Sequence, residues 1–254
     1  MSGLGIHAAL DALPTLPVAD VPTVTREQMR EVDRLMVDEY GIQLLQMMEN
    51  AGFNLADLLR RYLGGPLTGR RVVVLAGRGN NGGGGLTAAR RLSAWGATVE
   101  VILAASPDEL QDAPALQLNI LQRMGVPVQR FEGSLPPHEI LVDAVIGYSL
   151  EGPSRGVARD LIGAANASSS PVISLDVPSG VDVDSGEAAG EAVKASATMT
   201  LALPKPGLLQ SSALAYVGEL YLADISVPPD LYVRLGLSVP PLFAEGPLVI
   251  LRTT

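Results

Sequence analysis

The sequence predicts an α/β fold in which a mostly parallel central sheet is covered by helices on both faces. Seven apolar segments alternate with segments of helical periodicity along the chain. Most of the apolar segments are nearly continuous runs of Val, Ile, Leu and Ala, the pattern of parallel strands buried on both faces. The chain has 254 residues, of which 47% are hydrophobic, so it is long enough for one globular domain with a full core.

Two helices are expected ahead of the first of these strands. The first begins after Thr25, a suitable N-cap residue, and carries on one side Met29, Val32, Met36 and Val37. The second runs from about residue 43 to residue 62 and contains the segment Leu44-Leu-Gln-Met-Met-Glu-Asn-Ala-Gly52. Residues 1–21 contain no lysine or arginine, which fits neither a secretory signal nor an arginine-rich transit peptide. We therefore expect a flexible or loosely docked arm at residues 1–21, a single domain at residues 22–254, and a cytoplasmic location.

Strands and helices then alternate along the rest of the chain. The strands are expected at residues 71–76, 98–104, 127–131, 140–146, 171–176, 197–203 and 216–223. The intervening helices are expected near residues 84–95, 108–124, 155–168 and 206–214.

Composition disfavours several classes of function. The formal net charge of −9 argues against a nucleic-acid or anionic-membrane partner, because either would need a basic face. There is no cysteine and there are only two histidines, which disfavours a thiolate nucleophile, a Ser-His-Asp triad and a multi-histidine zinc site. The sequence lacks any window of about 18 uninterrupted apolar residues, so we expect no transmembrane span.

The most specific segment follows the first of the seven strands and reads Gly77-Arg-Gly-Asn-Asn-Gly-Gly-Gly-Gly-Leu86. Glycines allow positive φ angles and close approach of the backbone to a ligand, and free amides at a helix start bind anions such as phosphates. The order differs from the dinucleotide fingerprint G-x-G-x-x-G, and no Lys-Ser/Thr pair follows as in a Walker loop. The adjacent Asn80 and Asn81 are its distinguishing feature.

Further polar residues lie near the ends of later strands. Asp143 precedes the loop Gly147-Tyr-Ser-Leu-Glu-Gly-Pro153, Asp176 ends the next strand, and Lys205 follows the one after that. The carboxyl ends of parallel strands meet at one edge of the sheet, which is where ligands bind. We therefore expect two carboxylates, a lysine and several free amides to converge on one site.

These segments, together with Met48-Glu-Asn-Ala-Gly52, resemble in order the motifs of the NAD(P)H-hydrate epimerase family, also called the YjeF N-terminal domain, over residues 22–236. The family usually reads G-N-N-G-G-D-G-L, V-D-A-L-F-G, D-I-P-S-G and A-P-K at these places, and this chain has Gly84 in place of the first Asp. The resemblance implies a Rossmann-like three-layer αβα sandwich and a role in metabolite repair. The implied reaction interconverts R- and S-NADHX or NADPHX, in which C6 of the nicotinamide ring is hydrated.

The resemblance also assigns site residues. It implies that Asp176 is the catalytic acid–base residue, supported by Lys205, and that K⁺ binds to Asn81, Asp143 and Ser179, whose hard oxygen atoms suit a weakly charged cation. The implied substrate-binding residues are Gly79, Asn80, Asn81, Gly82, Gly83, Gly84, Gly147, Tyr148, Ser149, Leu150, Glu151, Gly152, Pro153 and Asp176. It further implies a homodimer with the helix at residues 26–39 in the interface, where apolar Met and Val side chains would otherwise be exposed.

Each of these polar residues also has an ordinary structural interpretation. Asn81 suits a turn, Asp143 a cap or loop anchor, and Ser179 a helix N-cap or turn. Asp176 has the alternative of bonding the amides of its own loop, at Ser179 and Gly180. Lys205 has the alternatives of a solvated loop lysine, a phosphate contact or a pair with Asp176. Asn50 is expected to tie the second helix to the glycine segment.

Other functions of the same fold stay open because of Gly84. One is a catalytically altered or inactive nucleotide-binding or scaffold protein, and another is an enzyme acting on a different nucleotide. The family often joins this domain to an ADP/ATP-dependent dehydratase. Since the sequence ends at Thr254, we expect a separate dehydratase in the same pathway to consume the S form.

Overall fold

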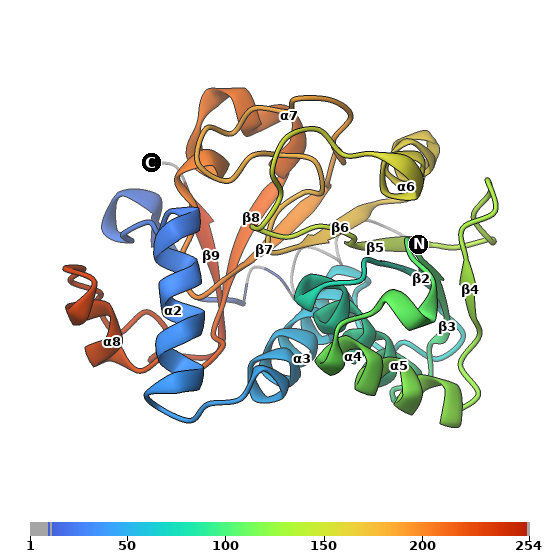
Figure 1. Cartoon of the computed structure of the whole chain (residues 1–254), viewed down its shortest axis with the longest axis horizontal. Helices are drawn as coiled ribbons and strands as arrows, with labels where there is room; N and C mark the ends of the chain where they lie inside the picture. Colours follow the sequence, from blue (N-terminus) through green and yellow to red (C-terminus); the bar gives the residue numbers. More distant parts are fainter. Residues whose placement is uncertain (1–9, 11, 253–254) are drawn as a thin grey trace.

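The computed structural model describes residue 10 and residues 12–252. They form a nine-stranded sheet with the strand order β1-β9-β8-β7-β6-β5-β2-β3-β4 (Figure 1). Neighbouring strands are parallel except for β8 and β9, which pair antiparallel. The predicted α/β class with a mostly parallel sheet is confirmed.

The seven expected strands are all present, as β2 to β8, and two more strands complete the sheet. Their bounds are β1 (Thr15–Pro17), β2 (Arg71–Ala76), β3 (Thr98–Leu103), β4 (Val128–Arg130), β5 (Ile140–Ala144), β6 (Val172–Leu175), β7 (Ala197–Leu201), β8 (Glu219–Ala223) and β9 (Leu248–Arg252). Sequence analysis missed β1, which has only three residues, and β9, which lies outside the alternation of strands with helices.

The expected helices are also present, with one exception. The α-helices are α2 (Arg26–Asp38), α3 (Leu44–Tyr62), α4 (Asn80–Ala94), α5 (Asp112–Arg123), α6 (Gly156–Ala167), α7 (Leu214–Val217) and α8 (Pro229–Arg234). The single helix expected at residues 206–214 is wrong, because two 3₁₀ turns, η3 (Pro206–Leu209) and η4 (Ser211–Ala213), are separated by Gln210 in an extended conformation. Proline and glycine at the start of this segment are poor α-helix formers. In the described chain, no helix is long and apolar enough to cross a membrane.

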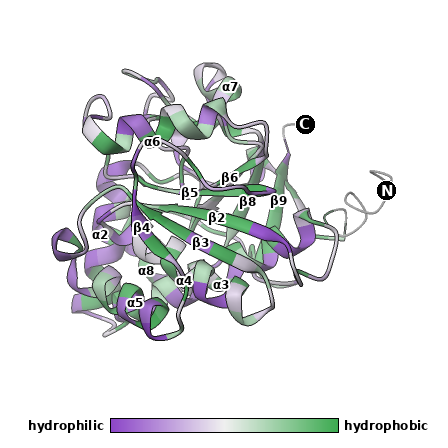
Figure 2. Cartoon of the chain, turned by 90° about the vertical axis from the view of Figure 1, so that its right-hand side faces the viewer, coloured by the Kyte–Doolittle hydropathy of each residue, from purple (hydrophilic) through white to green (hydrophobic). Residues whose placement is uncertain are grey.

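Helices cover both faces of the sheet, as predicted (Figures 1 and 2). Helices α3, α4 and α5 pack on one face, and α6 packs on the other. Along β2, Val72, Val74 and Ala76 point into the core under α3 and α4, whereas Val73 and Leu75 point into the core that contains residues of α6. Burial on both faces explains why this strand is a continuous apolar run.

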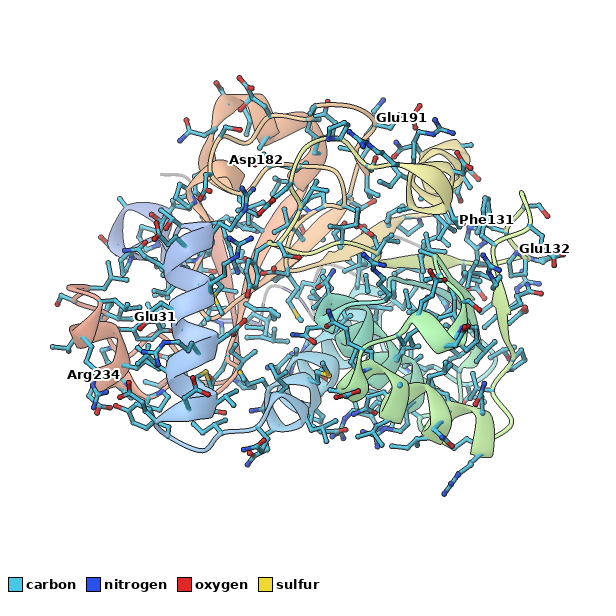
Figure 3. The ribbon with its side chains drawn as sticks, in the orientation of Figure 1. Glu31, Phe131, Glu132, Asp182, Glu191 and Arg234 are labelled. Atoms are coloured by element: carbon cyan, nitrogen blue, oxygen red, sulfur yellow. The ribbon has the colours of Figure 1, made fainter. Side chains whose placement is uncertain are left out.

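Helix α2 buries its apolar side within its own chain. Met29, Val32 and Met36 are each at most 3% exposed and share a core with Leu231 of α8. The outer side of this pair of helices carries charged residues such as Glu31 and Arg234 (Figure 3). The exposed apolar face that suggested a dimer interface at residues 26–39 is therefore absent.

The described part of the expected arm at residues 1–21 belongs to the domain. Strand β1 pairs with β9 at one edge of the sheet, and Leu13 and Val21 are buried. Residues 1–9 and 11 lie outside the described residues. The domain therefore begins earlier than residue 22.

Candidate active site

A cavity of about 910 Å³ opens at the carboxyl ends of the parallel strands, where the sequence predicted a ligand site. Segments that follow β2, β5 and β6 line it, together with parts of α2 and α3. The predicted site residues that line it are Gly79, Asn80, Asn81, Gly84, Gly147, Tyr148, Ser149, Leu150, Glu151, Pro153 and Asp176. Gly82, Gly83 and Gly152 are not among its lining residues.

Asp176 lies directly after β6 in the wall of this cavity and is only 3% exposed. Its Oδ2 accepts a hydrogen bond from the backbone N–H of Tyr148 at 3.1 Å, and its Oδ1 is paired with the ammonium group of Lys205. Its φ is 68°, a left-handed conformation that residues other than glycine rarely adopt. The amide of Ser179, which was one alternative partner, donates to Asp143 instead. A buried carboxylate on a strained backbone is a candidate for chemistry.

Lys205 is completely buried, so it is not a solvated loop lysine. Besides its ion pair with Asp176, its Nζ donates hydrogen bonds to the Oγ1 of Thr200 at 3.2 Å and to the carbonyl oxygen of Leu201 at 2.9 Å. All three ammonium hydrogens thus have acceptors, which is the condition under which a buried ion pair is tolerated. The pair holds the Asp176 carboxylate in one orientation.

The glycine segment is mostly helical, whereas the sequence predicted that the helix begins only near residue 84. Helix α4 begins at Asn80 with Gly79 as its N-cap, and none of the glycines at residues 82–85 has a positive φ. Close packing requires them instead. A Cβ on Gly82 would lie 1.9 Å from the carbonyl oxygen of Gly77, and one on Gly85 would lie 2.5 Å from the Cβ of Ala144. These glycines bring the start of α4 against the ends of β2 and β5.

The two glycines between them have different surroundings. A Cβ on Gly83 would lie 2.8 Å from the sulfur of Met48, so this residue packs against α3 and does not line the cavity. A Cβ on Gly84 would meet the side-chain tip of Leu175 at 2.8 Å, and Gly84 is part of the cavity wall. Within the run, position 84 is therefore the place from which a side chain would reach the cavity.

Helix α3 contacts α4 through residues other than the one expected. Met48 touches Gly83, and Gly52 lies so close to α4 that a Cβ on it would be 2.5 Å from the side chain of Thr87. The expectation that Asn50 ties α3 to the glycine segment is wrong, because its Nδ2 donates to the Oγ of Ser226 at 2.9 Å.

The predicted cation ligands gather at the carboxyl end of β5. The Asp143 carboxylate accepts hydrogen bonds from the Oγ of Ser179 at 2.5 Å, from the backbone N–H of Ser179 at 2.8 Å and from the Oγ of Ser174 at 2.7 Å. Complete burial raises the pKa of this carboxyl, although these hydrogen bonds act to lower it. Asn81 packs against Gly147, and its buried Nδ2 has no hydrogen-bond partner among the described residues.

This group of side chains fits an alkali cation better than a transition metal. No cationic side chain of the described residues pairs with Asp143, so its negative charge is hydrogen-bonded but not balanced. The donors are carboxylate, hydroxyl, carbonyl and amide oxygens, and no group of three or more His, Cys, Asp or Glu residues in the described chain is arranged to hold a metal ion.

The charged residues of the cavity wall that were not predicted are Asp33, Arg78, Glu109, Arg130 and Arg155. Asp33 projects from α2, and its carboxylate accepts a hydrogen bond from the Tyr148 hydroxyl at 2.6 Å. Arg78, Arg130 and Arg155 lie after β2, at the end of β4 and at the start of α6. The three arginines could have been predicted as site residues from the sequence, since each lies at a strand end or a helix start. Asp33 carried little, because a charged residue beside buried Val32 is ordinary on an amphipathic helix.

The chain is similar to a known protein family, to several of its members and to a solved structure. The family described as YjeF-related protein N-terminus matches residues 44–207. The chain is 47% identical to the NAD(P)H-hydrate epimerase of Dehalogenimonas lykanthroporepellens over 85% of this chain and 87% of that protein. It is 40% identical to the bifunctional NAD(P)H-hydrate repair enzyme Nnr of Thermofilum pendens over 84% of this chain and 41% of that protein. The crystal structure of yeast ynu0 matches with a TM-score of 0.75 and 27% identity, covering 91% of this chain and 100% of that one.

Proposed function

Because this chain belongs to the family of YjeF-related protein N-termini, we propose that it is an NAD(P)H-hydrate epimerase that interconverts R- and S-NADHX or NADPHX in metabolite repair. The observation that carries the proposal is the cavity at the strand ends, whose wall contains both the start of α4 and the Asp176 carboxylate. It therefore offers amides for the phosphates of a dinucleotide and an acid–base group for its ring.

The side chains in the wall suit an epimerisation. The hydrated carbon carries a hydroxyl group beside a ring nitrogen, and inverting it requires one bond at that carbon to break and form again. A proton leaves and returns in the course of this exchange, which an acid–base group accelerates. Asp176 supplies that group, while Lys205 orients it and offsets its negative charge. No net electron transfer occurs, so the reaction has no need of a redox cofactor.

The phosphates of the dinucleotide have a candidate binding place at the start of α4. The amides of Asn80 and Asn81, which line the cavity, belong to the first helical turn, where no carbonyl of the same helix can accept from them. The positive end of the helix dipole favours an anion there. The three arginines of the cavity wall add positive charge around the same opening.

A catalytically altered nucleotide-binding or scaffold protein is the second candidate function. It is favoured by Gly84, because the carboxylate that the family has at this position is missing from a residue that lines the cavity. The two candidates differ in one measurable property, the rate of epimerisation.

We expect the purified protein to accelerate equilibration of the two epimers of NADHX or NADPHX, because Asp176 and Lys205 are in place without an acid at position 84. Chromatographic separation of the epimers over time measures this rate. Gly84→Asp is the complementary variant, since its carboxylate would reach the cavity beside Leu175. A large gain in this variant means that the natural protein has drifted from the reaction. Inactivity of both proteins on both substrates rejects the epimerase and leaves the binding protein.

We also propose that K⁺ binds at Asn81, Asp143 and Ser179, where it would balance the buried Asp143 carboxylate. One observation supports this proposal: no cationic side chain of the described residues pairs with the buried Asp143 carboxylate. The Ser179 hydroxyl now donates to Asp143, so binding requires that it turn or that its carbonyl be the ligand.

Potassium is expected to raise the thermal stability of the protein, whereas choline at the same ionic strength is not. At a concentration 100 times its Kd, a ligand of the native state adds about 2.7 kcal/mol. Asp143→Asn should abolish the difference between the two salts, and a crystal grown with rubidium should show anomalous density among the three residues. Equal melting temperatures in both salts, or Mg²⁺ or Zn²⁺ at this place, would contradict the proposal.

The remaining proposals concern partners and location. We propose a dehydratase as the consumer of the S epimer, and the relatives named bifunctional NAD(P)H-hydrate repair enzymes are compatible with a second activity in the same pathway. A homodimer and a cytoplasmic location rest on the sequence interpretation alone. The dimer interface would have to lie away from the apolar side of α2, and light scattering against the 26.5 kDa mass of one chain decides the oligomeric state.

A further inference from the structure

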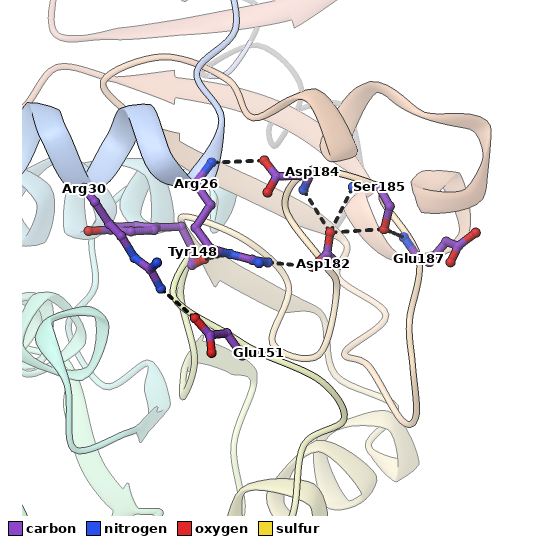
Figure 4. Close-up of polar contacts among 8 residues, drawn as sticks. All are labelled: Arg26, Arg30, Tyr148, Glu151, Asp182, Asp184, Ser185 and Glu187. Atoms are coloured by element: carbon purple, nitrogen blue, oxygen red, sulfur yellow. Dashed lines mark hydrogen bonds and ion pairs between the residues drawn. The ribbon is translucent and has the colours of Figure 1, made fainter.

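Tyr148 is held at three points by residues that are distant in sequence. Its backbone N–H donates to the Oδ2 of Asp176 at 3.1 Å, and its carbonyl oxygen accepts from the Nε of Arg26 at 3.1 Å. Its hydroxyl donates to the Oδ2 of Asp33 at 2.6 Å. Figure 4 shows Tyr148 between Arg26 and Arg30 of α2. Helix α2 therefore fixes the residue whose amide contacts the proposed acid–base group.

The hydrogen bond between Tyr148 and Asp33 has a defined direction. Burial, followed by the negative charge of Asp33, raises the pKa of the Tyr148 hydroxyl, so this group stays protonated and donates. Burial also raises the pKa of Asp33, and the charge of Asp176 adds to this rise, whereas the Tyr148 hydrogen bond and Lys205 lower it. The Asp33 carboxyl therefore lies close enough to the Asp176–Lys205 ion pair to interact with both charges.

We propose that Asp33 is a positioning residue for the epimerisation, because through the Tyr148 hydroxyl it holds the Tyr148 amide against the Oδ2 of Asp176. This inference rests on the proposed function of the cavity. With Lys205 on Oδ1 and the Tyr148 amide on Oδ2, both oxygens of Asp176 are held, and the carboxylate cannot rotate. Without Asp33, Tyr148 is held only through its backbone, by Arg26 on the carbonyl oxygen, and the contact of its amide with Oδ2 loosens. A misplacement of about 1 Å lowers a catalysed rate about 10²-fold.

Helix α2 makes two further contacts with the same loop. Arg26 holds the backbone of Tyr148 through its carbonyl oxygen, whereas Asp33 holds the side chain of Tyr148. Arg30 pairs with Glu151 at 2.9 Å, but their side chains are 51% and 71% exposed, and such surface pairs contribute little. Asp33 differs from Arg30 and Glu151 in that its hydrogen-bond partner, Tyr148, is also a partner of Asp176.

The test uses Asp33→Ala, Tyr148→Phe and the double variant of the full chain. Each single change is expected to lower kcat for epimerisation by about 10-fold to 10²-fold, with a smaller change in KM. The double variant should be no slower than the slower single variant, because both changes break the same hydrogen bond. Asp33→Asn should retain most of the rate, since its amide oxygen still accepts from the Tyr148 hydroxyl. Arg34→Ala, the neighbouring residue on the exposed side of α2, is the matched control and should leave kcat unchanged.

A second measurement does not depend on activity. Hydrogen exchange of the backbone amide at position 148 should speed up about tenfold or more in Asp33→Ala and Tyr148→Phe, because its hydrogen bond to Asp176 loosens. It should not change in Arg34→Ala.

Unchanged exchange in Asp33→Ala, or losses of kcat that add in the double variant, would overturn the inference. If Asp33→Ala does not fold, the exchange rate and kcat of Tyr148→Phe and Asp33→Asn test the inference in its place. A wild type without epimerase activity would reject only the proposed function, and the exchange rates would still show whether Asp33 positions Tyr148.

Discussion

Asp176→Asn is expected to slow epimerisation about 10²–10⁴-fold, the usual contribution of general acid–base catalysis. Asparagine keeps the size of the side chain and tolerates the left-handed conformation of residue 176, where φ is 68°. Its amide cannot take up and release a proton as a carboxylate does. Epimer equilibration followed by chromatography measures the rate, and calorimetry with NADP⁺ shows whether the cavity still binds a dinucleotide.

The matched control for this variant is Asp184→Asn. Asp184 lies on the loop that follows Asp176, is exposed and does not line the cavity. Its replacement should leave the rate unchanged. An Asp176→Asn protein that binds NADP⁺ and equilibrates the epimers at the wild-type rate would remove Asp176 from the chemistry.

Lys205→Met is expected to lower the free energy of unfolding by about 3–5 kcal/mol, because it leaves a buried carboxylate without its partner. The side chains of Lys205 and Asp176 are 0% and 5% exposed, so water cannot replace the lost contact. Methionine fills a similar volume, which keeps the effect of an empty space small. Urea unfolding followed by circular dichroism gives the free energy.

The double variant Asp176→Asn/Lys205→Met separates charge from packing. It removes both charges together, so it should recover most of the stability that Lys205→Met loses. Stability that falls by less than about 1 kcal/mol in Lys205→Met would show that the pair is solvated or that Asp176 is protonated in the native protein.

The strands of the sheet could be predicted from the sequence because a strand that is buried on both faces consists of consecutive apolar residues. The run at residues 71–76 coincides with β2, and strands β3 to β8 lie within three residues of their expected bounds. The start of α4 was predicted near residue 84 and lies at Asn80, for a reason that is also physical. Glycine is a poor helix former in isolation, but contacts with Gly77 and Ala144 leave room for nothing larger, and these contacts exist only in the folded chain.

The site was predictable where it follows the ends of strands. Asp143, Asp176 and Lys205 were expected to face one edge of the sheet, and the structure brings Asp176 and Lys205 into contact. Asp33 could not be found in this way. It lies in the middle of a helix, and its partner Tyr148 is 115 residues away in the sequence. The sequence around either residue gives no indication of the hydrogen bond between them.

The glycine turn at the start of α4 also has a thermodynamic consequence for ligand binding. Each glycine in a helix loses more conformational entropy on folding than alanine would, a penalty of about 0.5–1 kcal/mol, and four of them follow one another here. This turn is therefore the part of α4 with the lowest intrinsic helix propensity, and its packing against Gly77 and Ala144 offsets that penalty. An anion that binds its amides would bind only the helical form of the turn, so its binding free energy would add to the stability of the helix start.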